Sequence, residues 1–453
     1  MQSGARDQNF PGAVEFARAK LPANSALKFA PYWWDAAPRQ RDVRAPELPA
    51  RADVAIVGSG YTGLSAALTL ARRGVNVVVL ERDVPGFGAS TRNGGQIGSG
   101  NQKFKVKKLI ELRGHDNAIA MLREGTMMLE FIAELIDREK IDCHFTRCGR
   151  FRGAIRPAHY DAMARDMDDL REIAGVESFM VPRKDQHSEI GSDLFYGGSV
   201  LPNDGALHPG LFHAGLMQCV QNAGGQITGH AGVTRIDKNG NAYQLTTAAG
   251  ILTAHNVIIA TDGYTDNLIP ELNRRIVSVG SNMIATGIIP EETYARLMPK
   301  NRVYGNTNRV IYYFRGAPGE RRIVWGGRVG RLTGTNTPAA YAHLAGEMLE
   351  VFPELEGVQI THAWGGQIGY SNDEVPHIGQ TSDGAWYILG FSGTGVSRSV
   401  YFGNKVALKL LGDANGRTAF DDLPFDVIPL RPLTRRMIPI LEFWYRLRDR
   451  YNF

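Results

Sequence analysis

Hydrophobic and polar positions follow two different periods near the start of the chain. Residues 53–57 and 76–80 are short apolar runs rich in valine, which is typical of buried strands. Between them apolar residues recur with helical spacing, so we expect a helix from Thr62 to Arg73. This part of the chain therefore predicts a strand–helix–strand unit.

The rest of the chain mixes helical and strand patterns. Helical spacing predicts helices within residues 105–140, 160–174, 207–222, 341–352 and 400–411. Residues 226–260 and 275–330 instead alternate as short strands separated by turns. In the first helical region the expected core positions are Leu109, Leu112, Ile119, Leu122, Met128, Phe131 and Leu135.

A glycine-rich turn joins the first strand to its helix. Gly58 allows the tight turn, Gly60 lets a pyrophosphate approach the backbone, and Gly63 lets the helix pack closely on the sheet. The helix N-terminus then offers free amides to phosphate. Glu81 ends the second strand, where an acid accepts hydrogen bonds from ribose hydroxyls. The unit predicts a dinucleotide site.

Composition narrows the class of protein. The 453 residues are 43% hydrophobic and 21% charged, which fits a soluble protein with more than one core. The net charge of +5 is modest and spread along the chain, so we expect no nucleic-acid partner. The three cysteines indicate a reducing compartment rather than a disulfide framework. No apolar run approaches membrane-spanning length, and we expect a cytoplasmic protein with no metal site.

The glycine fingerprint occurs once, which indicates one tightly held cofactor and a separate substrate domain. We expect a leader over residues 1–50, a discontinuous cofactor domain over 51–100, 201–270 and 360–415, a substrate domain over 101–200 and 271–359, and a tail over 416–453. Tyr32, Trp33 and Trp34 are expected to anchor the leader by packing.

Five motifs in order resemble the D-amino acid oxidase/glycine oxidase superfamily of FAD-dependent oxidoreductases, and within it the γ-glutamylputrescine oxidase branch. They lie at residues 58–65, 88–96, 260–265, 373–379 and 390–396. The resemblance implies an α/β fold, in which a Rossmann-like FAD-binding domain of the glutathione-reductase type is interleaved with an α+β substrate domain that contains an antiparallel sheet.

The resemblance also implies which residues contact FAD. The loop at 88–96 is expected against the flavin and its phosphates, and the turn at 393–396 is expected to open a helix toward the flavin ring. The expected cofactor residues are Gly58, Gly60, Tyr61, Thr62, Gly63, Glu81, Arg82, Ala89, Ser90, Thr91, Asn93, Gly94, Gly95, Gln96, Val233, Thr261, Gly263, Gly393, Thr394, Gly395 and Val396.

Some members of the family attach their flavin through a late cysteine or through a histidine near the second glycine loop. This chain has no cysteine after Cys219 and no histidine between residues 82 and 114. We therefore expect FAD to be bound non-covalently.

Substrate recognition is expected on the strands at 303–331, from Tyr313, Arg315, Trp325 and Arg328. Arginine suits a carboxylate because its planar fork makes two parallel hydrogen bonds. Arg315 is expected at a strand end, where a pocket mouth could lie. The alternative is that the rings form the core of the sheet while the arginines face solvent.

The implied reaction is oxidation of an amine C–N bond, in which a hydride passes to flavin N5 and the imine is hydrolysed to an aldehyde plus an amine or ammonia. No catalytic side chain is assigned, because the cofactor carries the chemistry. A γ-glutamylputrescine-like amine is the favoured substrate and O2 the favoured acceptor, although residues 321–327 lack the lysine that assists oxygen in relatives. The alternatives are an oxidase or dehydrogenase of an N-substituted amino acid, or a non-catalytic FAD-binding subunit or tRNA-modifying partner.

Overall fold

The two apolar runs beside the glycine turn form neighbouring parallel strands. β1 (Arg51–Val57) pairs in parallel with β2 (Val77–Leu80) and with the last residues of β11 (Gly250–Ile259). They lie in an eight-stranded sheet of order β17-β18-β11-β1-β2-β8, extended by the β9–β10 hairpin. The other members are β8 (Gln226–Thr228), β9 (Val233–Asn239), β10 (Ala242–Thr247), β17 (His377–Gln380) and β18 (Trp386–Leu389). This computed structural model describes residues 27–39, 47–101, 104–328 and 336–451.

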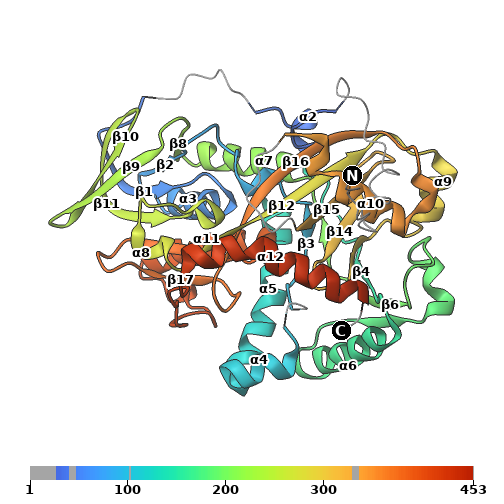
Figure 1. The fold of residues 1–453 in the computed structure, drawn as a ribbon. Coiled ribbons are helices and arrows are strands. Elements are labelled where there is room, and N and C mark those ends of the chain that lie inside the picture. Colours follow the sequence, from blue (N-terminus) through green and yellow to red (C-terminus); the bar gives the residue numbers. More distant parts are fainter. Residues whose placement is uncertain (1–26, 40–46, 102–103, 329–335, 452–453) are drawn as a thin grey trace, which may run out of the picture.

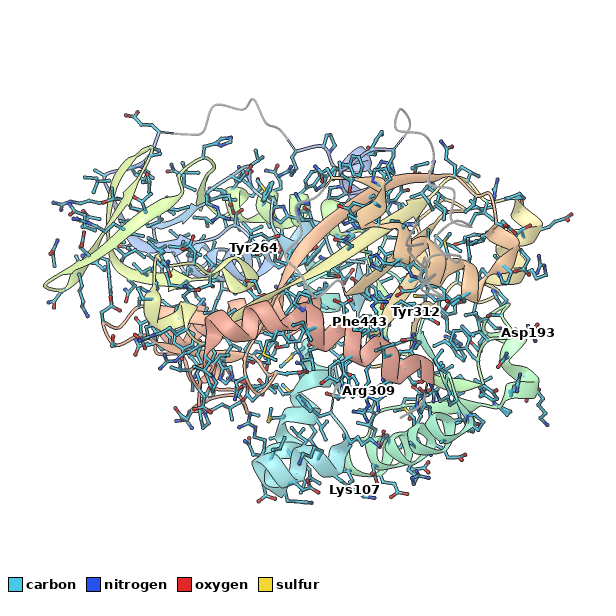
Figure 2. All side chains as sticks on the ribbon, in the orientation of Figure 1. Lys107, Asp193, Tyr264, Arg309, Tyr312 and Phe443 are labelled. Atoms are coloured by element: carbon cyan, nitrogen blue, oxygen red, sulfur yellow. The ribbon has the colours of Figure 1, made fainter. Side chains whose placement is uncertain are left out.

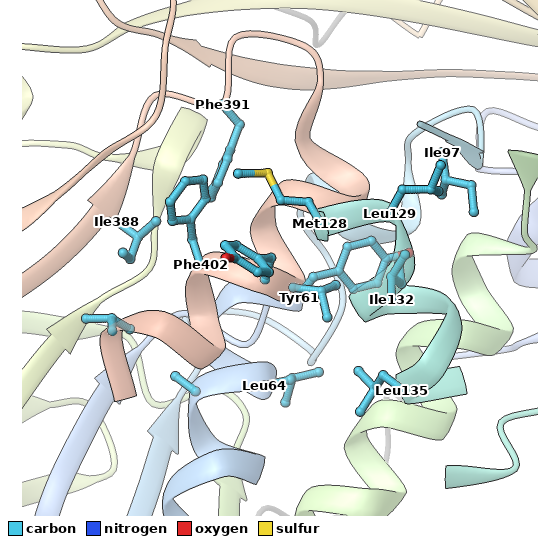
Figure 3. Close-up of a cluster of buried hydrophobic side chains, with 14 of the residues drawn as sticks. Tyr61, Leu64, Ile97, Met128, Leu129, Ile132, Leu135, Ile388, Phe391 and Phe402 are labelled. Carbon is cyan, nitrogen blue, oxygen red and sulfur yellow. The ribbon is translucent and has the colours of Figure 1, made fainter. Parts of the chain in front are cut away.

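Helices cover one face of this first sheet and form its core with it. α3 (Tyr61–Ala71) is buried along nearly its whole length, and α11 (Gly395–Leu410) packs against it. α5 (His115–Glu139) packs on α11. Figure 3 shows Leu64 of α3, Phe402 of α11 and Leu135 of α5 in this apolar cluster. The helix that follows the glycine turn is thereby fixed on both sides.

A second eight-stranded sheet lies beside the first (Figure 1). Its order is β16-β12-β15-β14-β13-β4-β6-β5, and its centre is antiparallel. Its strands are β4 (Arg150–Gly153), β5 (Phe179–Val181), β6 (Gly198–Leu201), β12 (Val277–Thr286), β13 (Val303–Asn306), β14 (Tyr312–Gly316), β15 (Ile323–Arg328) and β16 (Ile360–Tyr370).

The remaining elements surround the two sheets. Figure 1 shows α4 (Val106–Arg113) and α6 (Pro157–Ala174) near the lower end of α5, and α12 (Arg431–Tyr451) running across the front. The others are α2 (Trp33–Ala36), α7 (Pro209–Asn222), α8 (Pro270–Asn273), α9 (Glu291–Leu297), α10 (Ala342–Val351) and the short strands β3 (Gln96–Ile97) and β7 (Gly205–Ala206). Within the described ranges, none of the helices has the length and apolar character needed to cross a bilayer.

The structure differs from the sequence expectation at two elements. The region 105–140 is two helices, because Gly114 adopts a φ of 76° that ends α4 and begins α5. Leu112 on α4 is 53% exposed, so its predicted core position is wrong. β16 lies in the second sheet, whereas the sequence-based division placed residues 360–370 with the cofactor domain.

Candidate active site

A cavity of about 560 Å³ lies between the two sheets. Its first wall comes from the glycine turn, the loop at 86–98, the end of β11 and the start of α11, and its second wall comes from strands of the second sheet. Figure 2 shows Tyr264, one of its lining residues, between the two sheets. The volume falls in the range of cofactor and ligand pockets, about 300–1,000 Å³.

The glycine turn forms part of the first wall, and its three glycines have different neighbours. A Cβ on Gly63 would lie 2.0 Å from the Gly58 carbonyl oxygen, so Gly63 permits the packing of α3 and does not line the cavity. Gly58 has a φ of +107°, which only glycine adopts easily. A Cβ on Gly60 would approach one flexible atom, Ser90 Oγ at 3.1 Å, and otherwise enter the cavity.

Glu81 stands at the end of β2, at the same edge of the sheet. Its carboxylate accepts hydrogen bonds from the Ser59 amide at 3.0 Å, from the Ser59 hydroxyl at 2.6 Å and from the Asp83 amide at 3.1 Å. Glu81 therefore holds the glycine turn while lining the cavity, and a carboxylate has acceptor capacity left for a ribose hydroxyl. His213 supports the same turn, since its Nε2 bonds the Ser59 carbonyl at 2.8 Å. Burial lowers the pKa of His213 to about 4, so the ring is neutral.

The second glycine-rich loop is folded by its own side chains. Asn93 donates to the carbonyls of Ala89 and Ser90 and accepts from the Gly95 amide. The Ser90 hydroxyl accepts from the amide of Tyr61, the first residue of α3, at 2.9 Å. Thr91 points away from the cavity into the packing, and Gly95 is likewise not a lining residue.

Three side chains outside the predicted set hold this loop in place. The indole nitrogens of Trp33 and Trp34 donate to the Asn93 carbonyl at 2.8 Å and to the Thr91 hydroxyl at 2.9 Å. Arg92 donates to the carbonyls of Phe87 and Gly365, which ties the loop to β16. Trp33 and Trp34 therefore pack the leader on the second glycine loop, and the adjacent tryptophans were the signal in the sequence.

The start of α11 faces the cavity through Gly393, Thr394, Gly395 and Val396. Asp262, which sequence analysis did not select, fixes the turn before it by accepting amide hydrogen bonds from Gly390 at 2.9 Å and Phe391 at 3.4 Å. Burial raises the pKa of Asp262, while these amides act in the opposite direction. Asp262 thereby links the end of β11 to the helix that opens toward the cavity.

The first wall fits FAD by shape and by chemistry. Cβ atoms on Gly60, Gly393 and Gly395 would meet side-chain atoms no closer than 3.1 Å and would otherwise occupy space that a planar ring or pyrophosphate needs. The amides of two helix N-termini and the Glu81 carboxylate suit phosphates and ribose. The described lining residues include no cysteine or histidine, which favours non-covalent binding.

The expected cofactor residues divide by position. Eighteen line the cavity, namely Gly58, Gly60, Tyr61, Thr62, Glu81, Arg82, Ala89, Ser90, Asn93, Gly94, Gln96, Val233, Thr261, Gly263, Gly393, Thr394, Gly395 and Val396. Tyr61 takes part through its backbone, because its ring is 3% exposed and its hydroxyl donates to the Pro209 carbonyl. Gly63, Thr91 and Gly95 lie behind these residues.

The second sheet separates an apolar face from a face toward the cavity. Residues paired across neighbouring strands share a face. Arg152, Gly305, Tyr313 and Gly326 form one row across four strands, each paired with the next. Of these four residues, Arg152, Gly305 and Tyr313 line the cavity. Tyr313 lies beside the second glycine loop, since a Cβ on Gly94 would be 2.9 Å from its ring.

The opposite face of that sheet is an aromatic core, and Trp325 belongs to it. Its ring stacks on Phe314 with centroids 4.2 Å apart and on Tyr312 at 4.9 Å, and it has no exposed surface. Trp325 does not line the cavity, so the prediction that it contacts substrate is wrong. Tyr313 pairs with Gly326 across β14 and β15, so these two residues share a face of the sheet. Trp325 precedes Gly326 along β15, and because side chains alternate along a strand it lies on the other face.

Arg315 is on the cavity side of the sheet but does not reach the cavity. The residue is 6% exposed, and its guanidinium donates to the carbonyls of Leu207 at 2.8 Å, Gly316 at 2.9 Å and Gly95 at 3.2 Å. Burial lowers its pKa to about 10, which still leaves it charged at neutral pH. The expected pocket-mouth position is therefore wrong, and Arg315 joins the second glycine loop to the sheet. Arg328 is the last residue of β15, and its side chain lies outside the described atoms.

Two arginines on β4 line the cavity instead, and sequence analysis missed both. Arg150 forms an ion pair with Asp204 at 2.7 Å and donates to Gln96 Oε1 at 2.8 Å. Arg152 lies two residues farther along the same face. The sequence signal was the alternation Arg150-Phe151-Arg152, since Phe151 is completely buried between them.

The chain belongs to the family described as FAD dependent oxidoreductase, whose model matches residues 53–408. The protein is thus an FAD-dependent oxidoreductase, which confirms the family, fold class and cofactor predicted from the sequence.

Two curated relatives match over most of their length. The chain is 32% identical to the gamma-glutamylputrescine oxidoreductase of Escherichia coli over 404 residues, which is 88% of this chain and 93% of the relative. It is 30% identical to the probable oxidoreductase OrdL of Rhizobium meliloti over 430 residues, or 92% and 97% of the two chains. The crystal structure of glycine oxidase from Geobacillus kaustophilus has the same fold, with a TM-score of 0.70 at 20% identity over 84% of this chain and 99% of that chain.

Proposed function

We propose that this enzyme oxidises a γ-glutamylputrescine-like amine at the C–N bond of its terminal amine, with O2 as electron acceptor. The supporting relative is the gamma-glutamylputrescine oxidoreductase of Escherichia coli. The observation that carries the proposal is the composition of the cavity, in which the glycine loops face a sheet surface that presents Tyr313, Gly305 and Arg152. A long amine that bears a carboxylate at its far end suits such a surface.

FAD held on the first wall would supply a two-electron acceptor for the hydride on the carbon beside the amine nitrogen. The protein positions the substrate for this transfer. Tyr313 touches the second glycine loop, so an amine against its ring is held beside the cofactor loop. Water then hydrolyses the oxidised product to an aldehyde and ammonia, and no general base is required.

The acceptor is the second part of the proposal. The described lining residues include the cations Arg82, Arg92, Arg150 and Arg152 but no lysine. An oxidase with this lining activates O2 without a lysine in the cavity, whereas a dehydrogenase passes its electrons to another carrier. Peroxide formation distinguishes the two.

The test is steady-state turnover of γ-glutamylputrescine, putrescine and a panel of N-substituted amino acids, followed by peroxide and by a dye acceptor. We expect γ-glutamylputrescine to have the highest kcat/KM and to yield peroxide. Turnover with the dye alone would overturn the O2 assignment, and preference for an N-substituted amino acid would overturn the substrate. Absence of turnover with every amine and both acceptors would favour a non-catalytic FAD-binding subunit.

A further inference from the structure

Two neighbouring arginines of β4 face the cavity in different electrostatic states. Arg150 is neutralised by Asp204, whose side chain is 3% exposed, and it also donates to Gln96. Arg150 therefore joins β4 to the second glycine loop through its side chain. Arg152, two residues farther on, lacks such a counter-charge.

Arg152 makes one hydrogen bond to the described chain, from Nε to the Asn306 carbonyl at 3.2 Å. None of the described carboxylates lies within ion-pair distance of its guanidinium. Asp166 of α6 acts on it through space, but it lies 3.7 Å from Lys105. Burial lowers the pKa of Arg152, and the charge of Arg150 lowers it further. The guanidinium of arginine keeps its proton in proteins, so Arg152 carries a positive charge.

A half-buried charge without a counter-charge is costly unless a ligand supplies the opposite sign. The two terminal nitrogens of Arg152 make no hydrogen bond within the described ranges, so its planar fork can donate two parallel hydrogen bonds to a bidentate acceptor. A carboxylate has the matching geometry and charge.

The surface next to Arg152 has a slot of the right shape. Gly305 is the residue paired with Arg152 on β13, and a Cβ there would meet only the Tyr312 carbonyl oxygen at 3.9 Å. Tyr313 pairs with Gly305 on its other side. The ring of Tyr313 lies over Gly326, since a Cβ on Gly326 would be 2.6 Å from that ring. Arg152 and Tyr313 are two strand spacings apart, about 10 Å, with open space above Gly305.

We propose that Arg152 binds the carboxylate of the amine substrate, with the chain of the substrate lying in the slot over Gly305 and its reacting amine beside Tyr313. This inference rests on the proposed function for the identity of the substrate. It assigns the carboxylate site to β4, and it explains why this strand of the second sheet carries a charge that the described part of the fold leaves unpaired.

The test compares two amines that share the reacting end. γ-Glutamylputrescine has the carboxylate and putrescine does not. In the FAD-loaded full-length protein, Arg152→Gln should lower kcat/KM for γ-glutamylputrescine about 10- to 100-fold, mainly through KM, and change the value for putrescine less than about threefold. Arg152→Lys should restore part of the loss. Arg147→Gln, which removes an arginine paired with Glu130 outside the cavity, should change neither.

Gly305→Val keeps the test decisive if Arg152→Gln fails to fold. The valine fills the slot while leaving Arg152 in place, and the open space around this Cβ predicts that the fold tolerates it. It should cause the same selective loss. Equal losses on both amines with normal flavin content, in either variant, would overturn the assignment.

A binding measurement separates this inference from the proposed function. Calorimetry with γ-glutamylbutylamide, which lacks the oxidisable amine, should show binding to the wild-type enzyme and at least tenfold weaker binding to Arg152→Gln. The analogue without the carboxylate, 4-aminobutanoylbutylamide, should bind both proteins equally weakly. If no amine is oxidised but this pattern holds, the proposed function fails and the carboxylate site stands. If both analogues bind the wild type equally, the carboxylate site is wrong whatever the turnover.

Discussion

The two walls of the cavity are built in different ways. The wall formed by the first sheet presents mainly backbone, from glycines, loop amides and helix N-termini. Hydrogen bonds to Glu81, Asn93 and Asp262 hold this backbone in place. The wall formed by the second sheet presents side chains whose direction depends on strand alternation and register. A backbone surface tolerates little added bulk, whereas a side-chain surface can change its specificity with single residues. The first wall is therefore suited to a constant cofactor and the second to a particular substrate.

The largest expected effect comes from adding bulk to the backbone wall. Gly60→Val should abolish FAD binding and activity, because its side chain would occupy the space beside α3 that the pyrophosphate needs. The fold itself should survive, since only Ser90 Oγ is near the new Cβ. The measurement is flavin content together with circular dichroism. Gly346→Ala on α10, where nothing lies within 4 Å of the new Cβ, is the control and should keep its flavin. A fully loaded Gly60→Val protein would refute this assignment of the wall.

The aromatic face of the second sheet should respond in stability and not in selectivity. Trp325→Ala removes a fully buried ring stacked between Phe314 and Tyr312, at an expected cost of about 3–5 kcal/mol in the free energy of unfolding. Denaturant unfolding measures this cost. The ratio of kcat/KM values for γ-glutamylputrescine and putrescine should stay at the wild-type value, and a selective change without loss of stability would mean that Trp325 contacts substrate.

Replacing Arg315 tests whether this arginine has a structural role, in contrast to the substrate-binding role proposed for Arg152. Arg315→Ala leaves the buried carbonyls of Gly95 and Leu207 without their donor, at an expected cost of about 1.5–3 kcal/mol in stability. Activity should fall by the same factor on both amines, in contrast to Arg152→Gln. A loss confined to the carboxylated amine, with an unchanged melting temperature, would return the carboxylate site to Arg315.

The smallest effect concerns Asp373, which supports the turn before β17. Burial raises its pKa, but hydrogen bonds from His377 and Arg113 outweigh that and leave the pKa below its usual value. A carboxyl group whose pKa is lowered by folding stabilises the fold at pH values above its pKa in the unfolded chain, about 3.9. This stabilisation is lost as the pH falls through the pKa of the folded state. Asp373→Asn should therefore cost about 1 kcal/mol at pH 7 and almost nothing at low pH. Thermal unfolding of both proteins between pH 7 and pH 3 checks this, and a pH-independent difference would exclude the charge as the cause.

Sequence analysis selected residues that line the backbone wall of the cavity, but it missed the arginines of the side-chain wall, for physical reasons. The spacing of the glycines and the acid that follows β2 depend on the local strand–turn–helix geometry. Gly58, Gly60 and Glu81 could therefore be placed at the cavity without knowledge of the rest of the fold. The substrate wall depends on which strands become neighbours, and the parallel pairing of β4 with β13 joins residues far apart in the chain. The alternation of side chains along a strand could have shown that Trp325 and Tyr313 lie on opposite faces of the sheet. The position of Arg152 next to Gly305 follows only from the register of β4 and β13.

The most direct test of the account is anaerobic mixing of the purified, FAD-loaded protein with γ-glutamylputrescine while the visible flavin absorbance is recorded. Reduction in this experiment needs neither O2 nor a dye, so it reports the amine chemistry alone. We predict rapid bleaching by γ-glutamylputrescine, slower bleaching by putrescine, and release of the flavin from the protein by acid. Absorbance that stays unchanged with both amines would contradict amine oxidation as the function of this cavity.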